Sequence, residues 1–140
     1  MPGVNELMAS ASADMKAGKL NEALVKLDKV IELEPTMAEA HRMRGDVLLG
    51  STRYPEAAES YDRAFTLDSS LVESGLQAGQ LYERGGQPQK AIDIYSRLLQ
   101  VKPDLAEARW QLARLLQRRG RSQEARTHYE RLLQDAAYSA

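Results

Sequence analysis

Apolar residues recur along the chain at spacings of three and four, the spacing of one face of an α-helix. In the clearest stretch, residues 72–104, two such segments are joined by Gly85-Gly86-Gln87-Pro88. Glycine tolerates the left-handed turn at the end of a helix, and proline suits the first turn of the next one. The pattern therefore predicts a hairpin of two helices joined by a tight turn.

The same hairpin recurs four times, with a period of 34 residues. Each copy places a small residue in its first helix, and an alanine followed by two large residues at intervals of four in its second. The four registers are Ala11, Gly45, Gly79 and Ala113; Ala23, Ala57, Ala91 and Ala125; Leu27, Tyr61, Tyr95 and Tyr129; and Ile31, Phe65, Leu99 and Leu133. One hairpin cannot bury its apolar faces alone, so we expect the copies to stack.

This pattern resembles the tetratricopeptide repeat, whose signature has a small residue in the first helix, Ala-x3-aromatic in the second, and then a proline. The proline position holds Pro35, Ser69, Pro103 and Ala137. The resemblance implies an all-α fold, a right-handed superhelical solenoid of four helix-turn-helix hairpins. We expect a single domain, residues 1–140, with repeats at about 4–37, 38–71, 72–105 and 106–139. The expected helices lie near residues 4–17, 20–34, 38–50, 54–67, 72–84, 88–101, 106–119 and 122–136.

Local signals mark the ends of these helices. Gly18, Gly86 and Gly120 indicate the turn within three hairpins, and residues 51–55 make the turn in the second. Asp14 occupies a register that is apolar in the other copies, so the first helix is the least regular. Three helix starts have the spacing of a capping box, in which a short polar side chain and a glutamate satisfy free backbone N–H groups. These pairs are Thr36 with Glu39, Ser70 with Glu73, and Asp104 with Glu107.

Composition excludes several classes of protein. The 140 residues are 43% hydrophobic and carry a formal charge of −1, which gives no general attraction to nucleic acid. The chain has no cysteine, which excludes disulfides and Cys-based zinc sites. Its apolar runs are far shorter than the roughly 20 residues of a membrane span. Residues 1–16 lack the basic start and apolar core of a secretory signal. We therefore expect a cytoplasmic protein that binds neither nucleic acid nor membrane.

Candidate catalytic groups are few and widely separated. The only histidines, His41 and His128, fall in different copies, so a shared metal site would need the solenoid to fold back on itself. Gly85 and Gly86 lack the Lys-Ser/Thr pair of a phosphate-binding loop. Carboxylate pairs fall on solvated helix faces, where pairing within the helix explains them. We therefore expect no enzyme activity, no bound metal and no cofactor.

The resemblance also implies a binding surface, because the first helix of each hairpin lines a concave groove in tetratricopeptide arrays. On this face an apolar track of methionine, leucine and tryptophan crosses a polar trough. Methionine adapts to varied partners, and tryptophan gives a large anchor with a polar edge. The predicted partner-binding residues are Met8, Arg42, Met43, Asp46, Leu76, Gln77, Gln80, Trp110, Gln111 and Arg114.

Charge is unevenly divided along the chain. Residues 1–70 carry eight basic and twelve acidic side chains, a balance of −4, and residues 71–140 carry eleven and eight, a balance of +3. Arg114 and Arg118 lie one helical turn apart beside Trp110, where they suit an acidic side chain or a C-terminal carboxylate. The clamp by which some family members hold chaperone C-termini is not matched, because its positions hold Met8, Ser12, Met43, Glu73 and Gln77.

Three functions are compatible with these features. The leading one is a non-catalytic protein–protein interaction adaptor that binds a peptide or protein segment in the concave groove. The alternative is a structural or self-assembly module that forms a homodimer through its C-terminal helix. The third is RNA binding, which Asp46, Glu83 and the acidic first half oppose. Arg126, His128 and Asp135 replace apolar residues of earlier copies, which predicts that the fourth hairpin is a natural end of the array.

Overall fold

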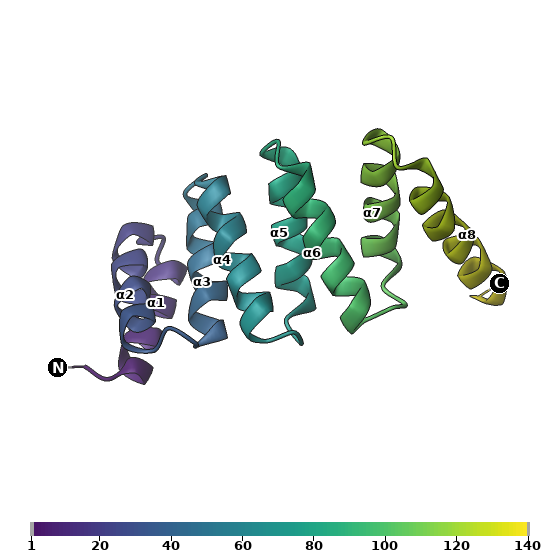
Figure 1. The fold of residues 1–140 in the computed structure, drawn as a ribbon. Helices are drawn as coiled ribbons and strands as arrows, with labels where there is room; N and C mark the ends of the chain where they lie inside the picture. The colour runs from purple at the N-terminus through teal and green to yellow at the C-terminus, as the bar shows by residue number, and fades with distance from the viewer. Residues whose placement is uncertain (1, 140) are drawn as a thin grey trace.

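The chain forms a row of helical hairpins in which each helix packs mainly against its neighbours in sequence (Figure 1). The computed structural model describes the backbone of residues 2–139 and the side chains of residues 2–136. The helices in this range are α1 (Val4–Lys16), α2 (Leu20–Leu33), α3 (Ala38–Gly50), α4 (Tyr54–Leu67), α5 (Val72–Arg84), α6 (Pro88–Val101), α7 (Ala106–Arg118) and α8 (Ser122–Ser139). They pair as α1–α2, α3–α4, α5–α6 and α7–α8. The prediction of an all-α array of stacked hairpins is confirmed.

The turn within each hairpin contains one residue with a positive φ angle. Gly18, Gly86 and Gly120 have φ angles of 76°, 73° and 78°, and Thr52 holds the same place in the second hairpin with a φ of 58°. These turns lie where the sequence predicts them. The predicted bounds of the first seven helices are correct to within one residue, whereas α8 continues to Ser139 instead of ending at residue 136.

In the two central hairpins, a tyrosine ring lies directly against a glycine of the partner helix. A Cβ atom at Gly45 would lie 2.7 Å from the Tyr61 ring, and one at Gly79 would lie 2.5 Å from the Tyr95 ring. Both tyrosines are fully buried. A larger residue at either glycine would therefore force the helices or the ring to move, and the small-residue register sets how closely the two helices approach.

The first helix of each later hairpin begins at an apolar residue and not at a polar cap. Met37, Leu71 and Leu105 hold the N-cap positions of α3, α5 and α7, and no side chain caps these helices. All three are partly buried, and Leu105 packs against the main core, so tertiary packing decides where the helices start. The prediction of three capping boxes is wrong, because each helix begins one residue later than the boxes of Thr36 with Glu39, Ser70 with Glu73 and Asp104 with Glu107 require.

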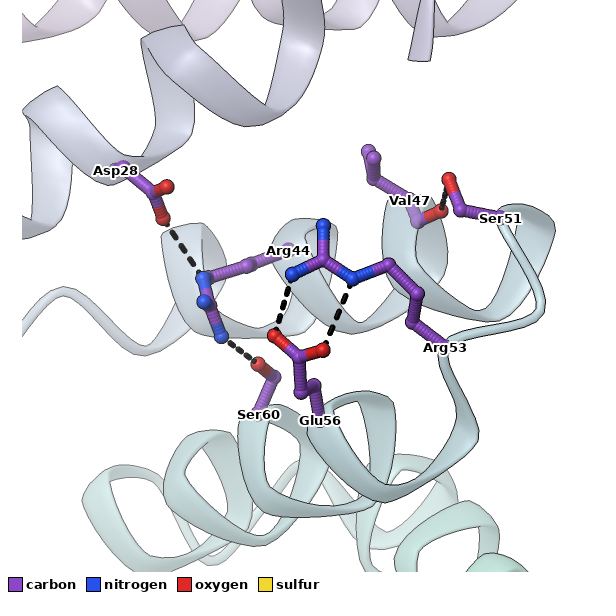
Figure 2. A network of polar contacts seen from close by, with 7 residues as sticks. All are labelled: Asp28, Arg44, Val47, Ser51, Arg53, Glu56 and Ser60. Carbon is purple, nitrogen blue, oxygen red and sulfur yellow. Dashed lines mark hydrogen bonds and ion pairs between the residues drawn. The ribbon is translucent and has the colours of Figure 1, made fainter. Parts of the chain in front are cut away.

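A polar network joins the first two hairpins (Figure 2). Arg44 of α3 donates from Nε to Asp28 Oδ1 of α2 and from Nη1 to Ser60 Oγ of α4, each at 2.8 Å. Ser60 is buried. At the start of α4, Arg53 donates two hydrogen bonds to the Glu56 carboxylate, at 2.9 and 2.6 Å. A single arginine thus connects three helices across this junction.

The later junctions are connected differently. Asp62, one period after Asp28, accepts a hydrogen bond from the Tyr82 hydroxyl of α5 at 2.7 Å and one from Arg97 Nη2 of α6 at 2.8 Å. At the third junction Ser96 replaces this aspartate, and its hydroxyl bonds to a carbonyl of its own helix. Hydrogen bonds and ion pairs between the third and fourth hairpins lie instead between α5 and α7.

The first hairpin has the smallest core. Asp14, in a register that is apolar elsewhere, forms an ion pair with Lys26 of α2 at 2.5 Å, which explains how α1 forms despite this residue. The other hairpins share one large cluster of buried residues, and Leu24 packs against both clusters. The smaller cluster comprises Ala11, Ala23, Leu27, Met43 and Val47.

The strained turn of the second hairpin yields a stability prediction. Replacing Thr52 by glycine is expected to stabilise the protein by up to about 1 kcal/mol. The left-handed conformation is strained for a residue with a Cβ, and relief of this strain outweighs the greater entropy that glycine gives the unfolded chain. Chemical denaturation would measure the free energy of unfolding. The reverse change, Gly86→Thr, is the matched control and should destabilise by a similar amount. A Thr52→Gly protein less stable than wild type would show that the Thr52 side chain stabilises the turn by other means.

Candidate functional site

Two open depressions lie on the side of the array formed by α1, α3, α5 and α7, which we call the first-helix face. The methionine depression, between α1 and α3, has a volume of about 430 Å3 and is lined by Met8, Ala9, Ser12, Met15, Lys16, Glu39, Arg42, Met43 and Asp46. The arginine depression, between α5 and α7, has a volume of about 440 Å3 and is lined by Gln80, Glu83, Arg84, Gln111, Arg114 and Arg118. Residues of first helices alone line both, so both open on this face.

In the methionine depression the charged groups pair with one another. Arg42 donates from Nη1 to Asp46 Oδ2 at 2.9 Å and also forms an ion pair with Glu39. The hydrogen bond with Glu39 is the main cause that raises the pKa of Arg42, so this guanidinium stays charged. Asp46 also accepts a hydrogen bond from the buried Tyr61 hydroxyl at 2.6 Å. The methionines supply the apolar lining, and their flexible thioethers adapt to side chains of different shape.

In the arginine depression two guanidinium groups converge on one carboxylate oxygen. Arg114 Nη2 donates to Glu83 Oε1, and Arg118 Nη1 lies 3.8 Å from the same atom. Arg114 also donates from Nε to Gln111 Oε1 at 3.2 Å. The Arg118 side chain is 66% exposed, whereas that of Glu83 is 20% exposed. Arg84 has no ion-pair partner in the part of the chain that the structure describes, so the depression carries excess positive charge.

The buried tyrosines nearest the two depressions, Tyr61 and Tyr95, differ in the hydrogen bonds of their hydroxyl groups. Tyr61 donates to Asp46, but the equivalent Tyr95 hydroxyl is buried without a hydrogen-bond partner among the described residues. The third hairpin has Gln80 in the register of Asp46, and no hydrogen bond joins it to Tyr95. Burial raises the pKa of Tyr95, as does the negative charge of Glu83, so the hydroxyl stays protonated and remains a donor.

The structure brings most of the predicted binding residues together in these two depressions. Met8, Arg42, Met43 and Asp46 line the methionine depression, although Met43 is 7% exposed and forms part of its floor. Gln80, Gln111 and Arg114 line the arginine depression. Gln77 lines neither depression and lies on α5 close to the Tyr61 side chain.

Besides Gln77, two predicted residues line neither depression. Leu76 is 5% exposed and belongs to the main core, because the neighbouring hairpin covers it. Trp110 holds the same register in the fourth hairpin and is 52% exposed, but it lines neither depression. Its ring packs edge-on against Tyr129 of α8, with centroids 5.6 Å apart. Arg84 lines the arginine depression but was not among the residues predicted from the sequence. It could have been identified from its place in the last turn of α5, directly after Glu83.

A third depression lies at the C-terminal end of the array, which we call the end surface. It has a volume of about 320 Å3 and is lined by Gln117, Ser122, Ala125, Arg126, Tyr129, Glu130 and Leu133. Leu133 is 71% exposed, whereas Phe65 and Leu99 in the same register are 3% and 9% exposed. The fourth hairpin has Ala113 in the register of the two glycines, and Tyr129 is only partly buried; its hydroxyl donates to Gln117 Oε1 at 3.0 Å.

The remaining candidate chemistry is dispersed. His41 bonds to the Pro35 carbonyl at 2.9 Å, and His128 bonds to Arg109 at 2.9 Å in a different hairpin. Within the described residues there is no group of three or more histidine, aspartate or glutamate side chains that could hold a metal ion. None of the helices in this part of the chain is long and apolar enough to cross a membrane.

Comparisons with known proteins agree with the hairpin repeat. Two sequence profiles described as tetratricopeptide repeat match residues 8–70 and 84–138. No curated protein matches the chain. Among solved structures, MamA is similar over 98% of this chain and 80% of its own, with 23% identity and a TM-score of 0.75. MamA from Desulfovibrio magneticus RS-1 is similar over 94% of this chain and 75% of its own, with 20% identity and a TM-score of 0.66.

A further similar structure is YrrB, described as a TPR protein with an unusual peptide-binding site. It is similar over 94% of this chain and 68% of its own, with 22% identity and a TM-score of 0.73. Identities this low support a shared fold and carry no information on partners.

The two tyrosines offer a matched pair of substitutions. Tyr61→Phe is expected to cost about 2 kcal/mol, because it removes a hydrogen bond to a charged group and leaves Asp46 with one donor fewer. Tyr95→Phe removes a buried hydroxyl that has no partner, so stability should stay the same or rise. Urea denaturation of both variants would compare their free energies of unfolding. An equal loss in the two proteins would mean that the Tyr95 hydroxyl is bonded in solution.

Proposed function

The chain belongs to the tetratricopeptide repeat family, whose arrays generally mediate protein–protein interaction, and we propose that it is a non-catalytic adaptor that binds a peptide or protein segment along the first-helix face. The observation that carries this proposal is that the two depressions lined by first helices alone open on the same face. One is apolar and adaptable, and the other is rich in hydrogen-bond donors. This is the combination by which protein surfaces anchor and orient a ligand.

The rest of the surface supports this choice of face. Two acidic side chains of second helices, Asp28 and Asp62, form contacts that hold the array together at the first two junctions. The first helices keep exposed donors such as Arg84 and Arg118. The related fold of YrrB, which has a peptide-binding site, is in keeping with this use of the hairpin array.

Filling the methionine depression tests the proposal. Ala9 and Ala13 are both exposed on α1, but only Ala9 lines the depression. Peptides would be selected from a displayed library on the wild-type protein, and their affinities measured by fluorescence anisotropy. Ala9→Trp should weaken binding about tenfold or more by occupying the space, a loss of roughly 1.4 kcal/mol. Ala13→Trp should leave affinity unchanged, and circular dichroism would confirm that both variants stay helical. Equal affinities in all three proteins would show that the methionine depression is not part of the binding site.

A second candidate function is self-association through the end surface, which the exposure of Leu133 beside Tyr129 favours. A second copy would not stack head to tail, because α1 presents Glu6 in a register where Ala40 and Ala108 are buried. Two end surfaces can instead face each other around a two-fold axis. Each offers apolar groups together with both signs of charge, as a self-complementary interface requires.

The oligomeric state tests this second candidate. Sedimentation at increasing protein concentration should show a dimer that Leu133→Glu abolishes, because a charge would be buried in the interface. Val25→Glu is the matched control, since Val25 is also 71% exposed but lies on α2 at the other end of the array. A protein that stays monomeric at high concentration, or a dimer that Leu133→Glu leaves intact, would contradict the candidate.

A further inference from the structure

The two depressions of the first-helix face differ in charge. In the methionine depression two basic side chains, Lys16 and Arg42, are balanced by Glu39 and Asp46. The arginine depression is lined by three arginines and one carboxylate, that of Glu83, which pairs with Arg114 and Arg118. The excess positive charge therefore lies at one end of the face, and a ligand that covers the whole face meets an apolar surface at one end and a cationic surface at the other.

The arginines of this depression already hold a carboxylate, which is supplied by the chain itself. Arg114 and Arg118 both approach Glu83 Oε1, and the exposed Arg118 retains donors that point to solvent. Planar guanidinium groups match carboxylates in geometry as well as in charge. The closest further acid is Glu107, which accepts a hydrogen bond from Gln80 Nε2 at 3.3 Å. Even with Glu107 counted, the basic groups outnumber the acidic ones.

The third hairpin lacks an acidic group that the second hairpin has in the same register. Asp46 provides a carboxylate for the Tyr61 hydroxyl at 2.6 Å. One period later the residue is Gln80, and the buried Tyr95 hydroxyl has no acceptor. The charges of both Glu83 and Arg114 act on this hydroxyl, so it lies close to the arginine depression. With glutamine instead of aspartate at position 80, the depression is lined by three arginines and by Glu83 as its one carboxylate, which makes this part of the face favourable for an incoming carboxylate.

We propose that the arginine depression binds an aspartate or glutamate side chain of the segment that occupies the first-helix face, and that Glu83 is an internal carboxylate that competes for the same arginines. The inference rests on the proposed function and specifies its ligand. The incoming carboxylate binds Arg118 and Arg84 and displaces Glu83 from Arg114. A side chain is the source, because the positions at which family members hold a C-terminal carboxylate carry Met8, Ser12, Met43, Glu73 and Gln77 here and lack the required donors.

The test uses a positional-scanning library of short peptides whose ends are acetylated and amidated, so that every carboxylate comes from a side chain. Peptides that bind wild type should be enriched in aspartate or glutamate at one position. Glu83→Gln should bind the selected acidic peptide about tenfold more tightly, because the competing charge is gone while the size of the side chain is kept. Arg118→Gln should bind it about tenfold more weakly, and added salt should weaken binding to wild type.

Glu124→Gln is the matched control, since Glu124 forms a comparable pair with Arg121 outside the depression; its affinity should equal that of wild type. Thermal unfolding would show whether Glu83→Gln keeps the third and fourth hairpins joined. Peptides that bind without acidic enrichment, or an affinity lowered by Glu83→Gln in a stably folded protein, would overturn this inference and leave the proposed function standing. A preference for the same peptides with a free C-terminus would overturn the side-chain source. If no peptide binds, the proposed function itself fails.

Discussion

The close approach of two helices at a glycine is the constraint on which the array depends. At Gly45 and Gly79 there is no room for even one more carbon atom against the facing tyrosine ring. This contact fixes the separation of the helices in the central hairpins, and the large side chains can then fill the core between one hairpin and the next. The depressions of the first-helix face are what remains between first helices that are spaced in this way. Their position is therefore a consequence of core packing.

The sequence predicted the helices and their turns well because both depend on local chemistry. The glycines of the turns and the 34-residue registers act within a few residues of the structure they produce. The capping boxes failed for the opposite reason. Thr36, Ser70 and Asp104 have suitable side chains, but the partly buried Met37, Leu71 and Leu105 hold the N-cap positions instead. Long-range packing overrode a local preference at three equivalent places.

The candidate site was predicted less completely, because a register identifies the face of a helix but not what covers it. Leu76 and Trp110 hold the same register, yet one is in the core and the other is half-exposed and packs against Tyr129 of α8. Likewise, Arg114 could be identified as a candidate donor from sequence, but its pairing with Glu83, 31 positions earlier, depends on how α7 lies beside α5. Charge counts along the chain nevertheless indicated the end of the face at which the excess positive charge lies.

The division of the core into two clusters has a consequence for how the first-helix face responds to occupancy. In an array whose hairpins contact only their neighbours, stability is a local property, and a hairpin with little buried surface opens more often than the rest. One side of the methionine depression is formed by α1, in which only Ala11 is completely buried. A segment bound there would suppress this opening, and part of its binding free energy would go into ordering α1. The arginine depression lies instead between α5 and α7, which bury seven and five residues, so we expect a smaller cost there. The same face therefore combines one end that binding would order with another that is better packed beforehand.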